Sequence, residues 1–162
     1  MDDSGHQIFE RLLAKLTDAG VVFQHTRHEP VYTSAEAARV RGSTLRSGAK
    51  ALIVKGGDAC LMVVLPADLS LDSNALRKHL RVKRLRFATQ EEVLAITGLT
   101  PGSIPPFGSL FDLTTICDER LSENEQINFN AGSHTESLQM TYDAYVAYET
   151  PTIVKVAKAV SR

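Results

Sequence analysis

The sequence predicts an α+β fold in which helices cover a mixed, mostly antiparallel central sheet. Three observations favour this class. Apolar, β-rich runs outnumber the segments with helical periodicity and cluster in the middle of the chain. Thr-x-x-Glu sequences at Thr33 and Thr89 have the spacing of a capping box and mark helix starts. A Gly-Gly-Asp turn joins two consecutive apolar runs into a hairpin.

The first part of the chain is typical of a helix, a short strand and a second helix. Apolar residues recur at helical spacing over 8–18, and Gly20 ends that helix. Residues 21–23 are expected to form a short strand. The second helix begins at Thr33 or Ser34 and ends at Gly42.

Strand signals dominate the rest of the chain. The expected strands share β-rich sequence bounded by turn residues, and they are 49–55, 59–65, 82–87, 110–117, 126–130 and 137–141. Further helices are expected after Asp72, from Thr89 to Gly98, and over 142–148 and 152–160. Residues 99–109 hold three prolines and two glycines, which favour an ordered loop.

The composition is that of an ordinary globular chain. Its 162 residues are 43% hydrophobic and 23% charged, which excludes whole-chain disorder and fits one domain over 1–162. No apolar run approaches the ~20 residues of a membrane span. The N-terminal residues lack the basic and apolar regions of a secretory signal. We therefore expect neither secretion nor a membrane partner.

Charge and cysteine usage restrict the partners and the compartment. A formal net charge of −1 excludes a surface that is basic all over and coats nucleic acid, and no DNA partner is expected. The same net charge allows a local basic patch. Cys60 and Cys117 each lie alone in a hydrophobic run, which favours a reducing cytoplasm over a disulfide scaffold. His25 and His28 have no further ligand at metal-site spacing, so no metal is expected.

Lys50 is the first candidate functional residue. It opens the apolar strand in the run Gly-Ala-Lys-Ala-Leu-Ile-Val, where its stem can pack while its ammonium group faces a cleft. The alternative, which periodicity alone favours, is a solvent-exposed lysine at a strand start.

The loop Gly-Ser-Ile-Pro-Pro-Phe-Gly at 102–108 is the second candidate. Its prolines fix the backbone, and its glycines allow a ligand to approach closely. Backbone N–H groups of such a stiff wall can be aimed at a carbonyl or phosphate oxygen. A rigid surface turn is the alternative.

The polar turn at 128–134 is the third candidate. Its His134 could act as a general base or contact a ribose, and its Ser133 could donate a hydrogen bond. The alternative is a hairpin turn with ordinary polar residues.

A basic stretch is the fourth candidate. Six Lys or Arg occupy the ten positions from Arg77 to Arg86, which suits the backbone of a polyanion. The interleaved Leu80, Val82 and Leu85 indicate that one face stays in the core. A solvated helix face is the alternative.

These motifs occur together in one order. They are Ser-Ala-Glu-Ala-Ala at 34–38, the lysine motif at 48–54, Gly-Ser-Ile-Pro-Pro at 102–106 and Phe-Asn-Ala-Gly at 129–132. The set resembles the YbaK/ProX family, the free-standing relatives of the editing domain in bacterial prolyl-tRNA synthetases. The resemblance covers residues 21–148 and implies the fold of that editing domain.

The resemblance also implies an activity. A member of this family is a trans-editing deacylase, which hydrolyses the ester between a wrongly attached small amino acid (Ala, Ser, Thr or Cys) and the terminal adenosine of a tRNA. Lys50 and Gly102 are then the expected catalytic residues. The expected substrate-binding residues are Ser103, Ile104, Pro105, Gly132, Ser133 and His134. The expected tRNA-binding residues are Arg77, Lys78, Arg81, Lys83 and Arg84.

The implied partner is the acceptor end of a mischarged tRNA, with an aminoacyl-tRNA synthetase as a second candidate and no cofactor. A non-catalytic module that binds the tRNA end or a synthetase is the competing class. The presence of Lys50 favours the enzyme, because a degenerate member is expected to have lost it. A small-molecule esterase is disfavoured, since the chain has no nucleophile motif.

Overall fold

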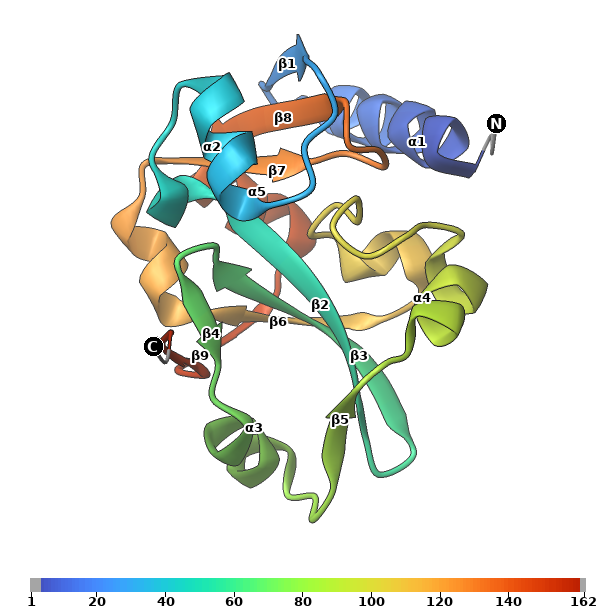
Figure 1. Cartoon of the computed structure of the whole chain (residues 1–162), viewed down its shortest axis with the longest axis vertical. Coiled ribbons are helices and arrows are strands. Elements are labelled where there is room, and N and C mark those ends of the chain that lie inside the picture. The colour runs from blue at the N-terminus through green and yellow to red at the C-terminus, as the bar shows by residue number, and fades with distance from the viewer. Residues whose placement is uncertain (1–3, 161–162) are drawn as a thin grey trace.

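The computed structural model describes residues 4–160. A five-stranded sheet runs through its centre (Figure 1), with the strand order β5-β2-β3-β6-β9. These strands are β2 (Ala49–Gly56), β3 (Ala59–Pro66), β5 (Leu85–Phe87), β6 (Thr114–Asp118) and β9 (Thr152–Val154). β2 pairs antiparallel with β3 and β5, whereas β6 pairs parallel with β3 and β9. The sheet is therefore mixed, as the sequence predicts.

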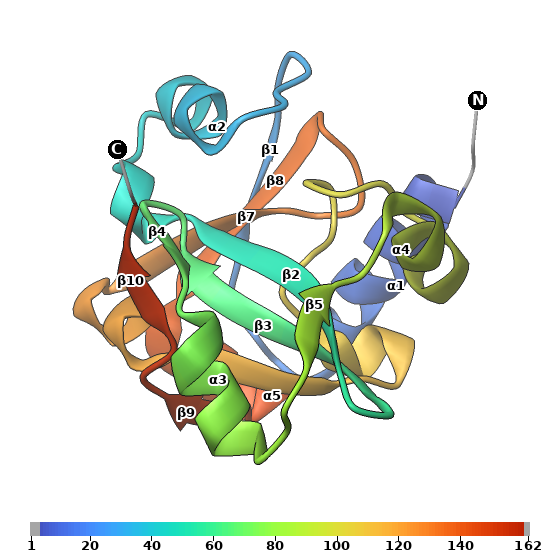
Figure 2. The same cartoon turned by 60° about the horizontal axis from the view of Figure 1, so that its bottom comes forward.

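Two smaller sheets flank the central one, and both are antiparallel. One joins β1 (Gln24–Arg27), β8 (Glu136–Thr141) and β7 (Gln126–Asn130), and the other joins β10 (Ala157–Ala159) and β4 (Leu69–Leu71). The helices are α1 (Ser4–Asp18), α2 (Ser34–Arg41), α3 (Ser73–Leu80), α4 (Gln90–Thr97) and α5 (Tyr142–Glu149). Figures 1 and 2 both show α2 and α3 at opposite ends of the molecule.

The central sheet separates two hydrophobic clusters. On β3, Met62 and Val64 pack into one cluster while Leu61, Val63 and Leu65 pack into the other. This is the period-2 alternation of a strand that is covered on both faces. The predicted α+β class, with helices covering a mixed sheet, is confirmed.

Local sequence signals predict the positions of several elements correctly. The hairpin of β2 and β3 forms at the Gly-Gly-Asp turn. At the start of α4, Thr89 and Glu92 form the reciprocal capping box, with N–H···O distances of 3.1 and 2.9 Å. At the start of α2, the Thr33 hydroxyl accepts the N–H of Glu36 at 3.1 Å, and α2 ends at Gly42 with φ +68°. The predicted boundaries of both helices are confirmed within one residue.

The predicted strand at 21–23 is wrong. The backbone N–H of Val21 still donates to the carbonyl of Leu16 at 2.9 Å, which closes the C-terminal turn of α1. β1 therefore begins only at Gln24, where pairing with β8 becomes geometrically available.

Two other predicted strands begin later than expected. Residues Gly108–Phe111 form a short 3₁₀-helix, so β6 starts at Thr114 rather than at 110. Arg81 caps α3 in the left-handed conformation (φ 59°), and β5 starts at Leu85 rather than at 82. In both places a helical turn uses residues that the apolar pattern assigned to a strand.

The helix predicted over 152–160 is also wrong, because this segment forms β9 and β10. The buried carboxylate of Asp118 accepts the N–H groups of Val156 and Ala157, both at 2.8 Å, and bends the chain between the two strands. The partner β4 was not predicted. Among residues 4–160, no helix has the length and apolar character that crossing a membrane requires.

Candidate active site

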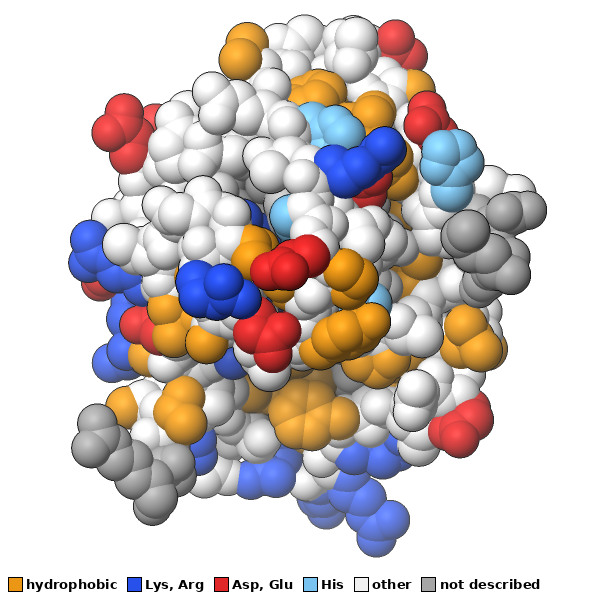
Figure 3. All heavy atoms as spheres, turned by 45° about the horizontal axis from the view of Figure 1, so that its top comes forward, with side chains coloured by type: hydrophobic (Ala, Val, Ile, Leu, Met, Phe, Trp, Pro, Cys, Tyr) orange, Lys and Arg blue, Asp and Glu red, His pale blue; other side chains and the backbone are white. Residues whose placement is uncertain are grey.

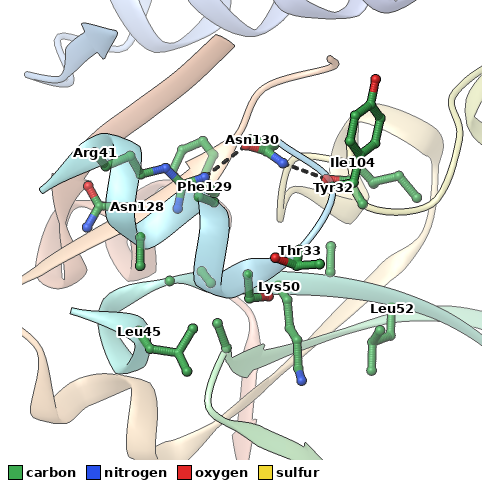
Figure 4. Close-up of a pocket in the computed structure, with 18 residues that line it drawn as sticks. Tyr32, Thr33, Arg41, Leu45, Lys50, Leu52, Ile104, Asn128, Phe129 and Asn130 are labelled. Carbon is green, nitrogen blue, oxygen red and sulfur yellow. Dashed lines mark hydrogen bonds between the residues drawn. The ribbon is translucent and has the colours of Figure 1, made fainter. Parts of the chain in front are cut away.

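A cavity of about 190 Å³ lies between α2, the start of β2, β7 and the loop at Gly102 (Figure 4). Lys50, Gly102 and Ile104 all line it. These three residues lie up to 54 positions apart in the sequence, and the fold brings them to one hollow. The cavity is thus the place where the expected catalytic residues meet.

Lys50 is the second residue of β2, paired with Leu65 of β3. Burial lowers the pKa of its ammonium group below the ordinary lysine value, and the negative charge of Asp68 partly offsets this effect. Figure 4 shows the Lys50 side chain extending away from Arg41 and Asn130, so the two cationic groups lie on different sides of the cavity. Within residues 4–160, Lys50 forms no ion pair and remains available to a ligand.

The loop is held from both ends. Gly102 has φ +90°, and its carbonyl accepts Nδ2 of Asn130 at 2.7 Å. Farther along, Phe107 is fully buried, with its ring centroid 5.4 Å from that of Phe129 and 5.3 Å from that of Tyr145. The loop is therefore a stiff wall, as the two prolines suggested.

The backbone N–H groups of this wall differ in their availability. That of Ser103 donates to the carbonyl of Thr100 at 3.2 Å. Those of Gly102 and Ile104 donate to no group within the described part of the chain. Both residues line the cavity, so their N–H groups are candidate donors to a bound oxygen.

The other expected substrate-binding residues do not reach this cavity. Ser103, Gly132, Ser133 and His134 line a second hollow of about 370 Å³ behind the loop, and the carbonyl of Pro105 accepts the N–H of Phe107. The N–H of Gly132 donates to the carbonyl of Ser103 at 2.8 Å, which fastens the turn to the loop. Their predicted contact with substrate stays a prediction.

His134 is fixed by its surroundings. Its Nδ1 donates to the carbonyl of Val31 at 2.9 Å, and its Nε2 lies 3.3 Å from the hydroxyl of Thr100. The Val31 carbonyl can only accept, so Nδ1 carries a proton, and in the neutral ring Nε2 accepts from the hydroxyl of Thr100. The ring also stacks against Tyr32, which lines the cavity. Since both ring nitrogens are engaged, the imidazole is arranged as a support.

Comparison with known proteins identifies the family of the chain. A model of the aminoacyl-tRNA editing domain matches residues 28–148, which is more than half of the chain. The chain belongs to the aminoacyl-tRNA editing domain family. Membership confirms the family and the editing activity that the sequence predicts.

Alignments with individual relatives of this editing domain cover most of the chain. ProXp-y of Escherichia coli strain K12, named a multifunctional Ser/Thr-tRNA deacylase, is 32% identical over 155 residues, and the alignment covers 93% of each chain. The prolyl-tRNA editing protein ProX of Acetoanaerobium sticklandii is 23% identical over 140 residues, which cover 83% of this chain and 85% of ProX. A solved structure provisionally assigned as a trans-editing enzyme for prolyl tRNA synthetase has the same fold, with a TM-score of 0.84 and 20% identity. That match covers 98% of this chain and 99% of the other.

The basic stretch lies away from the cavity of the editing domain. Lys78, Arg81, Lys83 and Arg84 are exposed and Arg77 is half-buried. None of these five forms an ion pair within residues 4–160. Arg86 differs, because its guanidinium group pairs with both oxygens of Glu92 at 2.7 and 3.0 Å.

The distance between the two sites follows from strand pairing. Leu85 pairs with Gly56 at the far end of β2, six residues from Lys50. At ~3.3 Å per residue, the end of the basic stretch lies roughly 20 Å from Lys50. The structure therefore does not bring the basic residues and the cavity together.

Two further cavity residues have no role assigned from the sequence. Arg41 reaches from α2 to Oδ1 of Asn130 and to the hydroxyl of Ser137, both at 2.9 Å, and burial lowers its pKa to about 10. Ser34 lines the cavity, and its hydroxyl makes no hydrogen bond among the described residues. Their spacing was a usable signal, since Ser34 and Arg41 lie seven positions apart and so share one helix face.

Proposed function

We propose that the chain hydrolyses mischarged aminoacyl-tRNA that carries a small amino acid, and that the cavity beside Lys50 holds the aminoacyl group. One observation carries the proposal. A lysine whose pKa is lowered and two unpaired backbone N–H groups meet at a cavity of about 190 Å³. Positioned donors in a confined space are what ester hydrolysis needs, because the ester itself is already reactive.

In the proposed reaction, water attacks the carbonyl carbon of the ester. The bond from that carbon to the ribose oxygen breaks, and the ribose oxygen takes up a proton. The products are the free amino acid and a tRNA with its terminal hydroxyl restored. The neighbouring ribose hydroxyl can relay the proton, as the family resemblance suggests.

The wall at Gly102 supports the step at which negative charge develops. The N–H groups of Gly102 and Ile104 are the proposed donors to the carbonyl oxygen as it becomes an oxyanion. Lys50 supplies positive charge to the transition state or orients the acceptor end. Neither role requires a covalent intermediate.

The cysteines are poor nucleophiles, which favours direct attack by water. Cys117 is fully buried, and burial together with the charge of Asp118 raises the pKa of its thiol to about 12. Cys60 lies on β3 and does not line the cavity. Hydrolysis by an aligned water is therefore the mechanism that fits these residues.

The size and lining of the cavity favour a small amino acid with a hydroxyl group. Its volume lies below the ~300–1,000 Å³ of sites for drug-sized ligands. The unpartnered hydroxyl of Ser34 is a candidate partner for a serine or threonine side chain. The name of the E. coli relative, a Ser/Thr-tRNA deacylase, supports the same class. Since one methylene is worth only ~1–3 kcal/mol, discrimination among small amino acids should be graded.

The acceptor end of the tRNA is the proposed partner at the cavity, and the basic stretch is the proposed contact for the phosphate backbone. Exposed cations roughly 20 Å from Lys50 can contact the stem while the acceptor end is seated in the cavity. A synthetase-docking module would leave the lined cavity without a role.

A deacylation panel tests the proposal. The protein is incubated with tRNAs charged with Ser, Thr, Ala, Cys or Pro, and release of the amino acid is compared with spontaneous hydrolysis. We expect release from Ser- and Thr-charged tRNA well above the spontaneous rate, with weaker action on proline. If charged tRNA binds but no amino acid is released from any of the five, the chain is a binding module and the proposal is wrong.

A further inference from the structure

Tyr32 is unusually exposed for an aromatic residue. Its side chain precedes α2 and lines the cavity, yet 72% of the residue is accessible to solvent. Figure 4 shows its ring at the rim of the cavity, beside Ile104, with the hydroxyl directed away from Lys50 and Leu52. That hydroxyl makes no hydrogen bond among the described residues. A large exposed ring at the mouth of a functional cavity is typical of a binding surface.

The ring of Tyr32 is also held in place. It stacks on the imidazole of His134 with ring centroids 4.7 Å apart and planes tilted by 38°. His134 in turn is fixed at Nδ1 by Val31 and at Nε2 by Thr100. The backbone N–H of Tyr32 points at the carboxylate of Glu36, at 3.4 Å. An aromatic ring that is supported on one side and open to solvent elsewhere forms a ready stacking platform.

The substrate chemistry places a base near this ring. If the aminoacyl group occupies the small cavity, the ester joins it directly to the terminal ribose. The base attached to that ribose must then extend out through the mouth of the cavity, where Tyr32 lies. On the face shown in Figure 3, Lys and Arg side chains gather mainly toward the left and lower margins, and others lie nearer the middle among hydrophobic, acidic and histidine side chains. Stacking on the exposed ring of Tyr32 is a contact that the mouth of the cavity offers to the base.

We propose that Tyr32, supported by His134, is the stacking platform for the terminal adenine of the tRNA. This inference rests on the proposed function and deepens it, because it names a binding subsite outside the aminoacyl cavity. It also gives His134 a role as a positioning residue that acts through Tyr32. Stacking of a base on an aromatic side chain is worth about a fivefold to hundredfold change in binding.

Two matched substrates isolate the stacking contact. One is the seryl ester of adenosine, and the other is the seryl ester of 1-O-methylribose, which has the same ester but no base. Tyr32→Ala removes the ring, Tyr32→Phe restores it without the hydroxyl, and Phe87→Ala is the control. Phe87 is also an exposed aromatic residue (56%), but it lies on β5 and outside the cavity.

We expect Tyr32→Ala to lower kcat/KM for the adenosine ester by about fivefold to a hundredfold, mainly through KM. Tyr32→Phe should recover the value, and Phe87→Ala should match the wild type. On the ribose ester, Tyr32→Ala should behave like the wild type. An equal loss on both esters, or no loss on the adenosine ester, would overturn the stacking role.

Binding separates this inference from the proposed function. The amide analogue of seryl-adenosine cannot be hydrolysed as an ester, so its affinity is measured by calorimetry on the same variants. If the wild type releases no amino acid from any charged tRNA of the panel, the proposed hydrolysis fails. The stacking role still stands when Tyr32→Ala weakens the amide by about fivefold or more, and it is wrong when the affinity is unchanged.

Discussion

Asn130 holds the carbonyl oxygen of Gly102, with 2.7 Å between Nδ2 and that oxygen. The other end of the same amide, Oδ1, accepts Nη2 of Arg41 at 2.9 Å. One side chain on β7 therefore ties α2 to the loop that forms the cavity wall (Figure 4). Because β7 is paired along its length with β8, this contact sets the position of a loop that has no strand partner of its own.

Replacing Asn130 by Asp tests this link. The carboxylate keeps an acceptor for Arg41 but loses the donor to Gly102 and places a negative oxygen against its carbonyl. We expect kcat/KM for deacylation to fall roughly tenfold or more, while the melting temperature changes little, since one hydrogen bond is worth about 1 kcal/mol. Asn74→Asp, on α3 and outside the cavity, should leave the rate unchanged. A wild-type rate for Asn130→Asp would show that the contact does not position the loop.

Gly102→Ala is expected to harm both stability and activity. Its φ of +90° is unfavourable for a side chain, which costs about 1–3 kcal/mol, and a Cβ would lie 3.4 Å from Cε1 of His134. Gly20→Ala is the matched control, because Gly20 has φ +74° and no neighbouring atom within 4 Å of the added Cβ. Chemical denaturation and single-turnover rates should show similar destabilisation in both variants but loss of activity per folded molecule only for Gly102→Ala. Equal activities in the two variants would make the loop merely structural.

Lys50 should lose its proton at a lower pH than an ordinary lysine. Burial lowers its pKa, and Asp68 partly raises it again, so Asp68→Asn should lower the pKa further. NMR titration of the ¹³Cε resonance, assigned with Lys50→Arg, measures both values directly. Titration of Lys50 at or above the ordinary ~10.4 in the wild type, or an upward shift in Asp68→Asn, would contradict this.

The basic stretch should contribute to tRNA binding and not to the chemistry. Replacing Arg81, Lys83 and Arg84 together by Gln should reduce the slope of log K against log salt by about 2–3, at −0.7 to −0.9 for each phosphate contact. Hydrolysis of seryl-adenosine should hardly change, because this substrate has no phosphate backbone. Arg86→Gln is the control within the same stretch, since Glu92 already neutralises Arg86. If the triple variant binds tRNA with unaltered affinity and salt dependence, another surface contacts the backbone.

The parts of the fold that sequence alone predicts are those determined by neighbours in the chain. The capping box at Thr89 and the turn between β2 and β3 each lie within a few residues of the element that they define. The C-terminal strands behave differently. They depend on the Asp118 carboxylate, which lies 38 and 39 positions from the N–H groups that it accepts. No local pattern encodes such a contact, so the apolar pattern there predicts a helix where two strands form.

The residues of the candidate site also divide into those that sequence motifs predict and those whose contacts depend on the tertiary fold. Lys50, Gly102 and Ile104 were singled out by motif, and the structure places all three on one cavity. Ser133 and His134, whose predicted contact with substrate stays a prediction, line the second hollow, and the N–H of Gly132 donates to the carbonyl of Ser103. Asn130 belongs to the Phe-Asn-Ala-Gly motif, whereas no motif includes Arg41, and the contact between these two residues depends on the tertiary fold. The tRNA contacts of the basic stretch stay a prediction.

Single-turnover deacylation of Ser-tRNA by Lys50→Ala is the most direct test of the central claim, which is that hydrolysis occurs at the Lys50 cavity. Lys55→Ala is the matched control, because Lys55 lies on the same strand but pairs with Glu92 at 2.7 Å. We predict that Lys50→Ala loses about 10²–10³ in rate while its melting temperature stays close to that of the wild type, and that Lys55→Ala keeps its rate. A folded Lys50→Ala protein that deacylates within a few-fold of the wild type would contradict the account.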